Sequence, residues 1–421
     1  MDQKIKFIEA KEILDSRGNP TVEVEAKSEI FFVKAGVPSG ASTGKLEAKA
    51  IGVPRAVKNI NEIIAPQLIG KNPCEQKNID DFLIELDGTD DKSKLGANAI
   101  IGVSMALAKL GAKVKNTPLY KHIFHISHFA SETSEIGTQT LMPKAAFNII
   151  NGGAHSQNDL DIQEFMVVPQ GEMFARNLEL AKDVYQNLQI LLKSKFRNIE
   201  MGDEGGFAPP ISSTKEALDL IMEAALRSSS IDKGKLKLVL DCAASQFQKN
   251  DKYELEESYF TKEELLNFYT GLISKYPIIG LEDPFGENDW QGFQLMFKQL
   301  GDKIIIIGDD LLVTNTKRIK EAAEKTACNG AIIKVNQIGT VSEAIEAVRL
   351  AKSFGWKIMV SHRSGETLDD FIADFAVGVS ADFIKSGAPA TPERLAKYNR
   401  LLAIEQEMLG SDPNNLINRY V

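Results

Sequence analysis

Acidic and basic residues follow short apolar runs in the second half of this chain, and their types suit a metal-assisted acid–base site. Three runs lead to a carboxylate, two to a lysine and one to a polar segment. The runs are Leu236–Leu240 before Asp241, Ile278–Leu281 before Glu282, Ile304–Gly308 before Asp309, Ala331–Ile333 before Lys334, Ile358–Val360 before Ser361–Ser364, and Asp382–Ile384 before Lys385. Carboxylate oxygens bind hard cations such as Mg²⁺, whereas lysine and arginine bind anionic groups.

Buried parallel strands are the elements that would bring these residues together. The runs are continuously apolar, as strands covered on both faces are, and they recur every ~20–40 residues with helix-like sequence between them. Parallel strands joined by helices carry their carboxyl ends on one side. In a single (β/α) barrel the six polar positions therefore meet at the mouth, where barrel enzymes carry their active sites.

Two domains of different type are predicted. Residues 1–126 read as an α+β domain, with a three-stranded meander over residues 4–38 and helices near 54–69, 75–86 and 97–115. Residues 127–140 are rich in Ser and Thr and predict a linker, and 141–421 predict the α/β barrel. Its first two strands, Ala145–Ile150 and Ile162–Val168, lie only about ten residues apart, so the barrel is expected to open with an antiparallel hairpin.

Composition excludes several classes of protein. The 421 residues carry a net charge of −9, which argues against a nucleic-acid surface. No apolar run reaches the ~18–20 residues that span a bilayer, and the amino terminus shows no apolar signal region. Three widely separated cysteines predict a reducing compartment without a disulfide framework. These features predict a cytoplasmic protein whose anionic substrates are attracted by local cations.

The strand-end residues also have simpler interpretations. An acidic residue at a strand end often caps the helix that follows it. We favour metal binding because three acids fall in register at successive strand ends, and the absence of His and Cys among them disfavours zinc. A lysine such as Lys334 or Lys385 is usually a surface residue. Beside divalent cations a lysine loses affinity for its proton and can serve as a base.

Several loops are candidates of a weaker kind. Gly202–Pro209 holds Glu204 among glycines, and this sequence fits either a general acid in a close-packed loop or a solvated turn. The loop Asn151–His155 offers a histidine that is either structural or part of the site. Gly40–Lys45 lacks the glycine spacing of a nucleotide-binding P-loop, which we reject. A metal face is the less favoured interpretation of the histidines spaced three apart, which are His122, His125 and His128.

With these residues assembled, the chain resembles the enolase family of phosphopyruvate hydratases from about Ile5 to Glu407. The similarity rests on segments several residues long that occur in the family's order. These segments are Glu12–Thr21, Val37–Gly44, Asn148–Gly153, Gln163–Met166, Gly202–Pro209, Lys334–Gly339, Ser361–Thr367 and Ile384–Pro389. The resemblance implies a TIM-like barrel of enolase type behind an N-terminal α+β domain, and the reversible dehydration of 2-phospho-D-glycerate to phosphoenolpyruvate.

The resemblance also implies two Mg²⁺ ions in each active site. Asp241, Glu282 and Asp309 would bind the first ion, to which the substrate carboxylate also coordinates. Ser42, in the loop after the meander, would help to hold the second ion together with the substrate phosphate, and the neighbouring Ala41 would contact the substrate. Lysine-based proton abstraction beside Mg²⁺ is an established pattern for this superfamily.

Further roles follow residue by residue from the same resemblance. Lys334 would take the C2 proton, and Glu204 would protonate the departing C3 hydroxyl, supported by Glu164 and Gln163. Lys385 would meet the substrate carboxylate. Arg363 and Ser364 would clamp the phosphate. His155 and His362 would border the substrate, and His362 is also a catalytic candidate.

The chain departs from the family pattern at a few places. About ten residues that relatives carry after Glu47 are missing, and the short segment Ala48–Pro54 replaces them. We expect this segment to offer fewer polar contacts that anchor the preceding loop. Gln246 stands where the family usually has Glu, Thr391-Pro392 replace Arg-Ser, and Lys144–Ala146 replace a stretch with Val-Pro. These changes bear on packing or assembly more than on chemistry.

Two other functions compete with enolase activity. One is a lyase or racemase of the wider superfamily that acts on a different carboxylate; Arg363, Ser364 and the Ser42 loop argue against it because they serve a phosphate. The other is a binding or structural protein that kept the fold, which the filled catalytic positions disfavour. The family resemblance also implies a homodimer or larger homo-oligomer, and a secondary pool at the cell surface or outside the cell.

Overall fold

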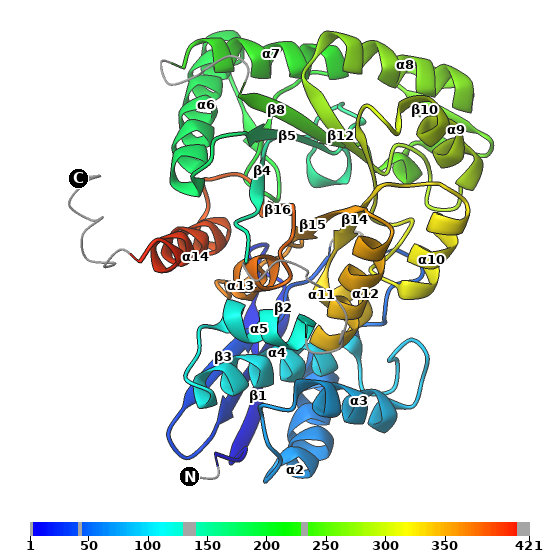
Figure 1. Cartoon of the computed structure of the whole chain (residues 1–421). Coiled ribbons are helices and arrows are strands. Elements are labelled where there is room, and N and C mark those ends of the chain that lie inside the picture. Colours follow the sequence, from blue (N-terminus) through cyan, green and yellow to red (C-terminus); the bar gives the residue numbers. More distant parts are fainter. Residues whose placement is uncertain (1–2, 41–43, 129–139, 229–234, 411–421) are drawn as a thin grey trace.

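The computed structural model describes residues 3–40, 44–128, 140–228 and 235–410 in two stacked parts (Figure 1). The N-terminal part begins with an antiparallel sheet of β1 (Phe7–Leu14), β2 (Pro20–Lys27) and β3 (Phe32–Gly36), in that order. In β2, buried Val22 and Val24 alternate with half-buried Glu23 and Glu25, because one face of the sheet packs on helices. The predicted meander is confirmed.

Helices cover this sheet. They are α1 (Val53–Asn59), the π-helical turn η1 (Ile60–Ile64), α2 (Ala65–Leu68), α3 (Gln76–Asp87), α4 (Ala97–Val114) and α5 (Leu119–His128). The helix expected near 54–69 thus contains a π turn. Among the described residues α4 is long and apolar enough to cross a membrane, but it is 78% buried as a core helix, and α1 and α4 both contact the sheet.

Eight strands close into a barrel. Its sheet runs β16-β15-β14-β13-β12-β8-β5-β4, and a β16–β4 pairing completes the circle. Only β5 runs antiparallel to both neighbours, so the expected opening hairpin of β4 and β5 is confirmed. The barrel strands are β4 (Lys144–Asn151), β5 (Glu164–Pro169), β8 (Leu236–Asp241), β12 (Ile278–Glu282), β13 (Ile305–Gly308), β14 (Gly330–Ile333), β15 (Lys357–Ser361) and β16 (Phe383–Lys385).

Apolar side chains fill the barrel interior, and helices surround it. The interior cluster comprises Ala146, Met166, Val168, Val239, Ile307, Ile332, Met359 and Phe383. The helices of this part are α6 (Phe174–Lys195), α7 (Thr214–Leu226), α8 (Lys262–Lys275), α9 (Trp290–Leu300), α10 (Thr316–Glu324), α11 (Val335–Ile338), α12 (Val341–Ser353), α13 (Phe371–Gly378) and α14 (Pro392–Met408). Because the core is closed and packed, chemistry is confined to the rim.

Short elements decorate the rim. They are the 3₁₀ turns η2 (Gly153–His155) and η3 (Ala244–Gln246), and the strands β6 (Glu200–Met201), β7 (Phe207–Ala208), β9 (Gln248–Lys249), β10 (Lys252–Leu255) and β11 (Ser258–Phe260). Side-chain caps stabilise the first turn of several surrounding helices. Thr261 and Glu264 form a capping box at α8, and Asp289 caps α9.

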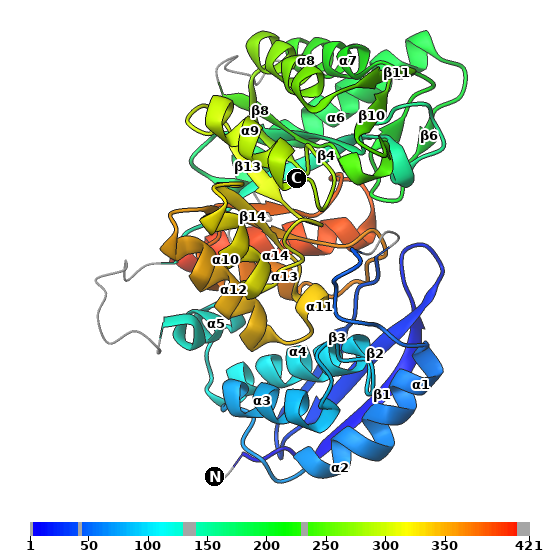
Figure 2. The same cartoon turned by 90° about the vertical axis from the view of Figure 1, so that its right-hand side faces the viewer.

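The N-terminal part lies against the carboxyl ends of the barrel strands. Ser39 and Gly365 exchange backbone hydrogen bonds, and α5 packs on α13 (Figure 2). The helix α5 includes Ser127 and His128, the first two residues of the predicted linker, while residues 129–139 lie outside the described residues. The N-terminal loops therefore help to build the mouth of the barrel.

Candidate active site

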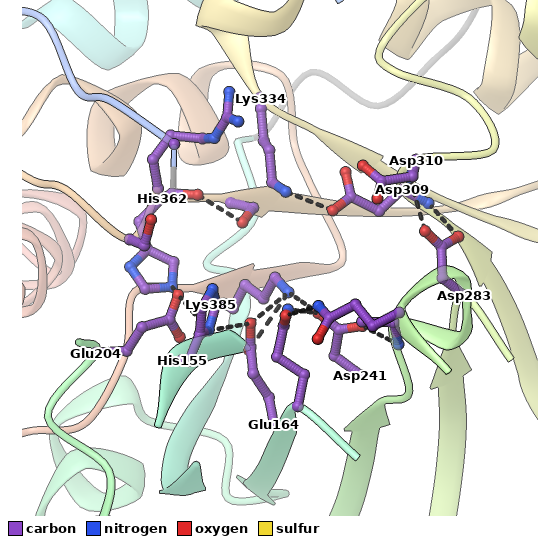
Figure 3. Close-up of a pocket in the computed structure, with 17 residues that line it drawn as sticks. His155, Glu164, Glu204, Asp241, Asp283, Asp309, Asp310, Lys334, His362 and Lys385 are labelled. Carbon is purple, nitrogen blue, oxygen red and sulfur yellow. Dashed lines mark hydrogen bonds and ion pairs between the residues drawn. The ribbon is translucent and has the colours of Figure 1, made fainter. Parts of the chain in front are cut away.

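Three carboxylates meet at the mouth as the strand ends predicted. Asp241 and Glu282 are the last residues of β8 and β12 and pair in register, and Asp309 directly follows β13. The three residues are 3%, 0% and 7% exposed. Parallel pairing sets Glu282 beside Asp241, whereas Glu282 pairs with Ile307, two residues before Asp309. Figure 3 shows Asp241 and Asp309 in the pocket.

Lys385, at the end of β16, lies among these acids. Its Nζ is 2.8 Å from both carboxylate oxygens of Glu282 and 3.4 Å from Oδ2 of Asp241 and Oε1 of Glu164. Burial, together with Asp241, raises the pKa of Glu282 well above its ordinary value. Burial lowers the pKa of Lys385, but Glu164 and Glu282 outweigh it and raise that pKa. Crowded hard oxygens of this kind fit a divalent cation, which would relieve their repulsion.

A second acidic group adjoins the first. Oxygens of Asp283, Asp309 and Asp310 lie within 4.8 Å of one another. Asp283 accepts the backbone N–H groups of Asp309 and Asp310 at 2.9 and 2.7 Å. Burial, then the charge of Asp309, raises the pKa of Asp310 to about 7. Asp283 and Asp310 were not among the predicted site residues, although each directly follows a predicted ligand in the sequence.

Lys334 faces the same acids from the next strand. Its Nζ forms an ion pair with Oδ2 of Asp309, and its backbone N–H donates to Thr314 Oγ1 at 3.0 Å. Burial lowers the pKa of Lys334, but the attraction of Asp309 outweighs it, so the pKa is raised. In this structure the amine is therefore held as an ammonium by the carboxylate beside it.

Two glutamates and two histidines form the opposite wall (Figure 3). His155 Nδ1 lies 3.8 Å from Glu164 Oε1 and 3.6 Å from Glu204 Oε1, and His362 Nε2 lies 3.3 Å from Glu204 Oε1. Asn148 Nδ2 donates to Glu204 Oε2 at 2.9 Å. The sequence thus predicted four members of one buried cluster that come from four different loops and strands, although it did not predict Asn148.

The two glutamates differ in their affinity for a proton. Burial, then the charge of Glu204, raises the pKa of Glu164 well above its ordinary value. Burial alone would raise the pKa of Glu204 too, but His362 and His155 hold this pKa well below its ordinary value. Burial lowers the pKa of His362 to about 4. Of the two carboxyl groups, Glu164 is therefore the one whose surroundings favour a proton.

The expected phosphate clamp contacts the N-terminal part. Arg363 binds both carboxylate oxygens of Glu47, at 2.9 and 3.1 Å, and Arg17 donates to Ser364 Oγ at 3.3 Å. The pKa of Arg363 is raised because Glu47 outweighs the effect of burial, which lowers it. Neither Glu47 nor Arg17 was predicted as a site residue. Ala41 and Ser42 lie outside the described residues.

One buried arginine holds the loops of this wall. Arg394, on α14, donates to the carbonyl oxygens of Arg363, Ser364 and Asp203 at 2.7, 2.6 and 3.0 Å, and contacts Nδ1 of His362. Its sequence position, in a charged helix, gave no signal of this role. Eleven predicted residues line one pocket, and they are His155, Gln163, Glu164, Glu204, Asp241, Asp309, Lys334, His362, Arg363, Ser364 and Lys385.

Comparisons with known proteins agree with this geometry. The profile described as "Enolase, N-terminal domain" matches residues 5–123, and the one described as "Enolase, C-terminal TIM barrel domain" matches residues 139–415. A curated relative from Solanum lycopersicum, named enolase, is 46% identical over 437 aligned residues that cover 97% of this chain and 96% of the relative. The chain therefore belongs to the enolase family.

Proposed function

We propose that this enzyme of the enolase family converts 2-phospho-D-glycerate reversibly to phosphoenolpyruvate, with Lys334 as the base and Glu204 as the acid. One observation carries the assignment of roles. Lys334 and the Glu164–Glu204 pair face each other from opposite sides of a single buried pocket (Figure 3). A substrate between them has its C2 proton on the side of the lysine and its C3 hydroxyl on the side of the glutamates.

Lys334 removes the C2 proton in this proposal. The amine needs to be neutral, and Asp309 keeps it charged in the structure. Asp309 would be less able to stabilise the ammonium form if its oxygens also held a cation, and the pKa of Lys334 would then be lower. Asp309 would thereby link metal binding to the protonation of the base.

The glutamate pair supplies the proton for the leaving hydroxyl. The raised pKa of Glu164 favours a proton on that carboxyl group, and His155 lies between the two carboxylates. A substrate that carries several negative charges raises the proton affinity of Glu204, which sits nearest His362. The proton is then available at Glu204 Oε1, while Asn148 fixes the other oxygen.

The remaining residues bind the ends of the substrate. Arg363 and Ser364 would bind the phosphate, because a guanidinium presents a fork of donors that matches phosphate oxygens. Lys385 would meet the substrate carboxylate. His362, whose Nε2 lies 3.3 Å from Glu204 Oε1, would border the substrate beside the acid.

Two Mg²⁺ ions are proposed. Asp241, Glu282 and Asp309 would hold the first, and Ser42, outside the described residues, would contribute to the second. Bound magnesium neutralises the charge that develops on the substrate carboxylate during proton loss. The buried carboxylate oxygens described above are the donor type that Mg²⁺ prefers.

Assembly and location are proposed on the family resemblance alone. We infer a homodimer or larger homo-oligomer that acts on a small phosphorylated acid in the cytoplasm, with a secondary pool at the cell surface or outside the cell. The alternative superfamily activity on an unphosphorylated carboxylate is disfavoured because Arg363, the phosphate ligand of this proposal, lines the pocket. A non-catalytic role is disfavoured by the complete acid–base pair.

The test follows phosphoenolpyruvate by its absorbance when the purified chain is given 2-phosphoglycerate and MgCl₂. We expect turnover that stops when EDTA is added. Lys334→Ala should abolish both dehydration and exchange of the C2 proton with solvent, whereas the exposed Lys317→Ala should change neither. Activity that persists in EDTA would contradict the metal assignment, and retained proton exchange in Lys334→Ala would contradict the base.

A further inference from the structure

We propose that Gln246 is a positioning residue that sets the orientation of the Gln163 side-chain amide and, through it, holds the carboxylate of Asp241. The inference rests on the proposed function, in which Asp241 is a magnesium ligand. Gln246 is the last residue of η3, the short turn that follows β8. Its side chain reaches from the rim into the pocket that Gln163 and Asp241 line.

A directed series of hydrogen bonds connects the three side chains. The backbone N–H of Ala154 donates to Gln246 Oε1 at 2.9 Å, and Gln246 Nε2 donates to Gln163 Oε1. Gln163 Nε2 then donates to Asp241 Oδ2 at 3.2 Å. Every donor in the series points toward Asp241.

The two ends of the series fix both amide orientations. A backbone N–H can only donate, so the atom of Gln246 that faces Ala154 is its oxygen. A metal-binding carboxylate accepts, so the atom of Gln163 that faces Asp241 is its nitrogen. The oxygen and nitrogen of a glutamine amide are otherwise hard to tell apart. Here the Ala154 N–H, which only donates, and the Asp241 carboxylate, which accepts, determine which atom is which.

The surroundings hold Gln246 in this place. Gly153, with φ +50°, leaves room for its amide, since a Cβ there would lie 2.9 Å from Gln246 Oε1. The start of η3 holds the other oxygen of Asp241, because the backbone N–H of Ala243, the residue just before η3, donates to Oδ1 at 3.0 Å. With a donor on each oxygen, the carboxylate is prevented from rotating and presents a fixed edge to a cation.

Calorimetric titration with MgCl₂ in the absence of substrate tests this inference on the full chain. We expect Gln246→Ala to raise the dissociation constant of Mg²⁺ about tenfold. In a Gln163→Met background the same substitution should change it by less than about twofold, because Gln246 acts through Gln163. The exposed Lys249→Ala, on β9 three residues away, is the matched control and should bind as the unaltered chain does.

Kinetics provide a second readout. Gln246→Ala should raise the Mg²⁺ concentration needed for half-maximal activity while kcat at saturating Mg²⁺ stays within about twofold, which a general loosening of the fold would not do. Unchanged Mg²⁺ affinity in Gln246→Ala would overturn this inference but not the proposed function. The same holds if the effects of Gln246→Ala and Gln163→Met on the dissociation constant multiply in the double variant, because the two residues would then act independently. Absence of Mg²⁺ binding by the unaltered chain would overturn the proposed metal site and this inference with it.

Discussion

Glu47 and Arg363 form a two-point ion pair between the N-terminal part and the barrel. Both terminal nitrogens of Arg363 donate to the Glu47 carboxylate, at 2.9 and 3.1 Å. The side chain of Arg363 is 4% exposed and that of Glu47 is 8% exposed. Glu47 Oε1 also accepts the backbone N–H of Gly44 at 3.0 Å. The guanidinium that we propose for phosphate is therefore already bound to a carboxylate from the segment next to the substrate loop.

We expect Glu47→Gln to bind phosphate more tightly. The substitution removes a negative charge that competes with phosphate for Arg363. Even at the dielectric constant of water a charge at ~4 Å is worth about 1 kcal/mol, so the affinity should rise at least about fivefold. The KM for 2-phosphoglycerate and the inhibition constant of inorganic phosphate should both fall. Glu29→Gln removes the same charge from an exposed site and serves as control. A higher KM in Glu47→Gln would mean that Glu47 holds Arg363 in place for phosphate.

Glu204→Gln should separate the two proton transfers. Without an acid at this position the hydroxyl departs slowly, and a loss of about 10²–10⁴ in dehydration is expected. Lys334 lies on the other wall, so exchange of the C2 proton with deuterium from solvent should survive. Nuclear magnetic resonance of 2-phosphoglycerate recovered from D₂O measures both rates. Equal loss of exchange and dehydration would assign Glu204 a different role.

Strand ends were predictable because burial on both faces forces continuous apolar sequence up to the residue that reaches the mouth. All six runs became barrel strands, and Asp241, Glu282, Lys334 and Lys385 stand where the runs stop or directly after. The opening hairpin followed from connection length alone. Roles in catalysis came from the family resemblance, since spacing along the chain does not say which acid faces which lysine.

Side-chain contacts between residues far apart in the sequence could not be predicted. Glu47 and Arg363 are 316 positions apart, and Arg394 reaches the loop after β15 from a helix whose sequence reads as a solvated charged face. Such contacts depend on how the two parts pack, and a local pattern carries no trace of them. The segment after Glu47 is itself held by hydrogen bonds to Asn98, Gln337 and Asp91, and the expectation that it anchors the loop with fewer polar contacts than in relatives stays a prediction.

His122 should make the fold less stable in acid. It is fully buried on α5, and within the described residues neither ring nitrogen has a hydrogen-bond partner. Burial, then the charge of Lys115, lowers its pKa from 6.5 to about 4. Between these values only the unfolded chain binds the proton, so the free energy of unfolding falls as pH drops, by about 2 kcal/mol between pH 7 and 5.

Urea unfolding at both pH values checks this expectation. His122→Leu fills a similar volume without a titratable ring, so about 2 kcal/mol of the pH dependence should disappear. Ile126→Leu, at a half-buried position of the same helix, changes no titratable group and should leave the pH dependence as it is. An unaltered slope in His122→Leu would place the acid sensitivity in other groups, with the buried carboxylates first among them.

The short segment after Glu47 is held by Asn98, whose Oδ1 accepts the N–H of Ile51 at 3.1 Å and whose Nδ2 donates to the Ile51 carbonyl at 2.8 Å. Ala48 and Lys49 add backbone bonds to Gln337 and Asp91 at 2.8 and 2.7 Å. Asn98→Ala removes two bonds of about 1 kcal/mol each, so trypsin should cleave after Lys49 about tenfold faster or more, and the KM for 2-phosphoglycerate should rise. Asn59→Ala, which frees the Leu95 carbonyl nearby but does not touch the segment, is the control. Equal cleavage rates in both variants would show that the other backbone bonds suffice to anchor the segment.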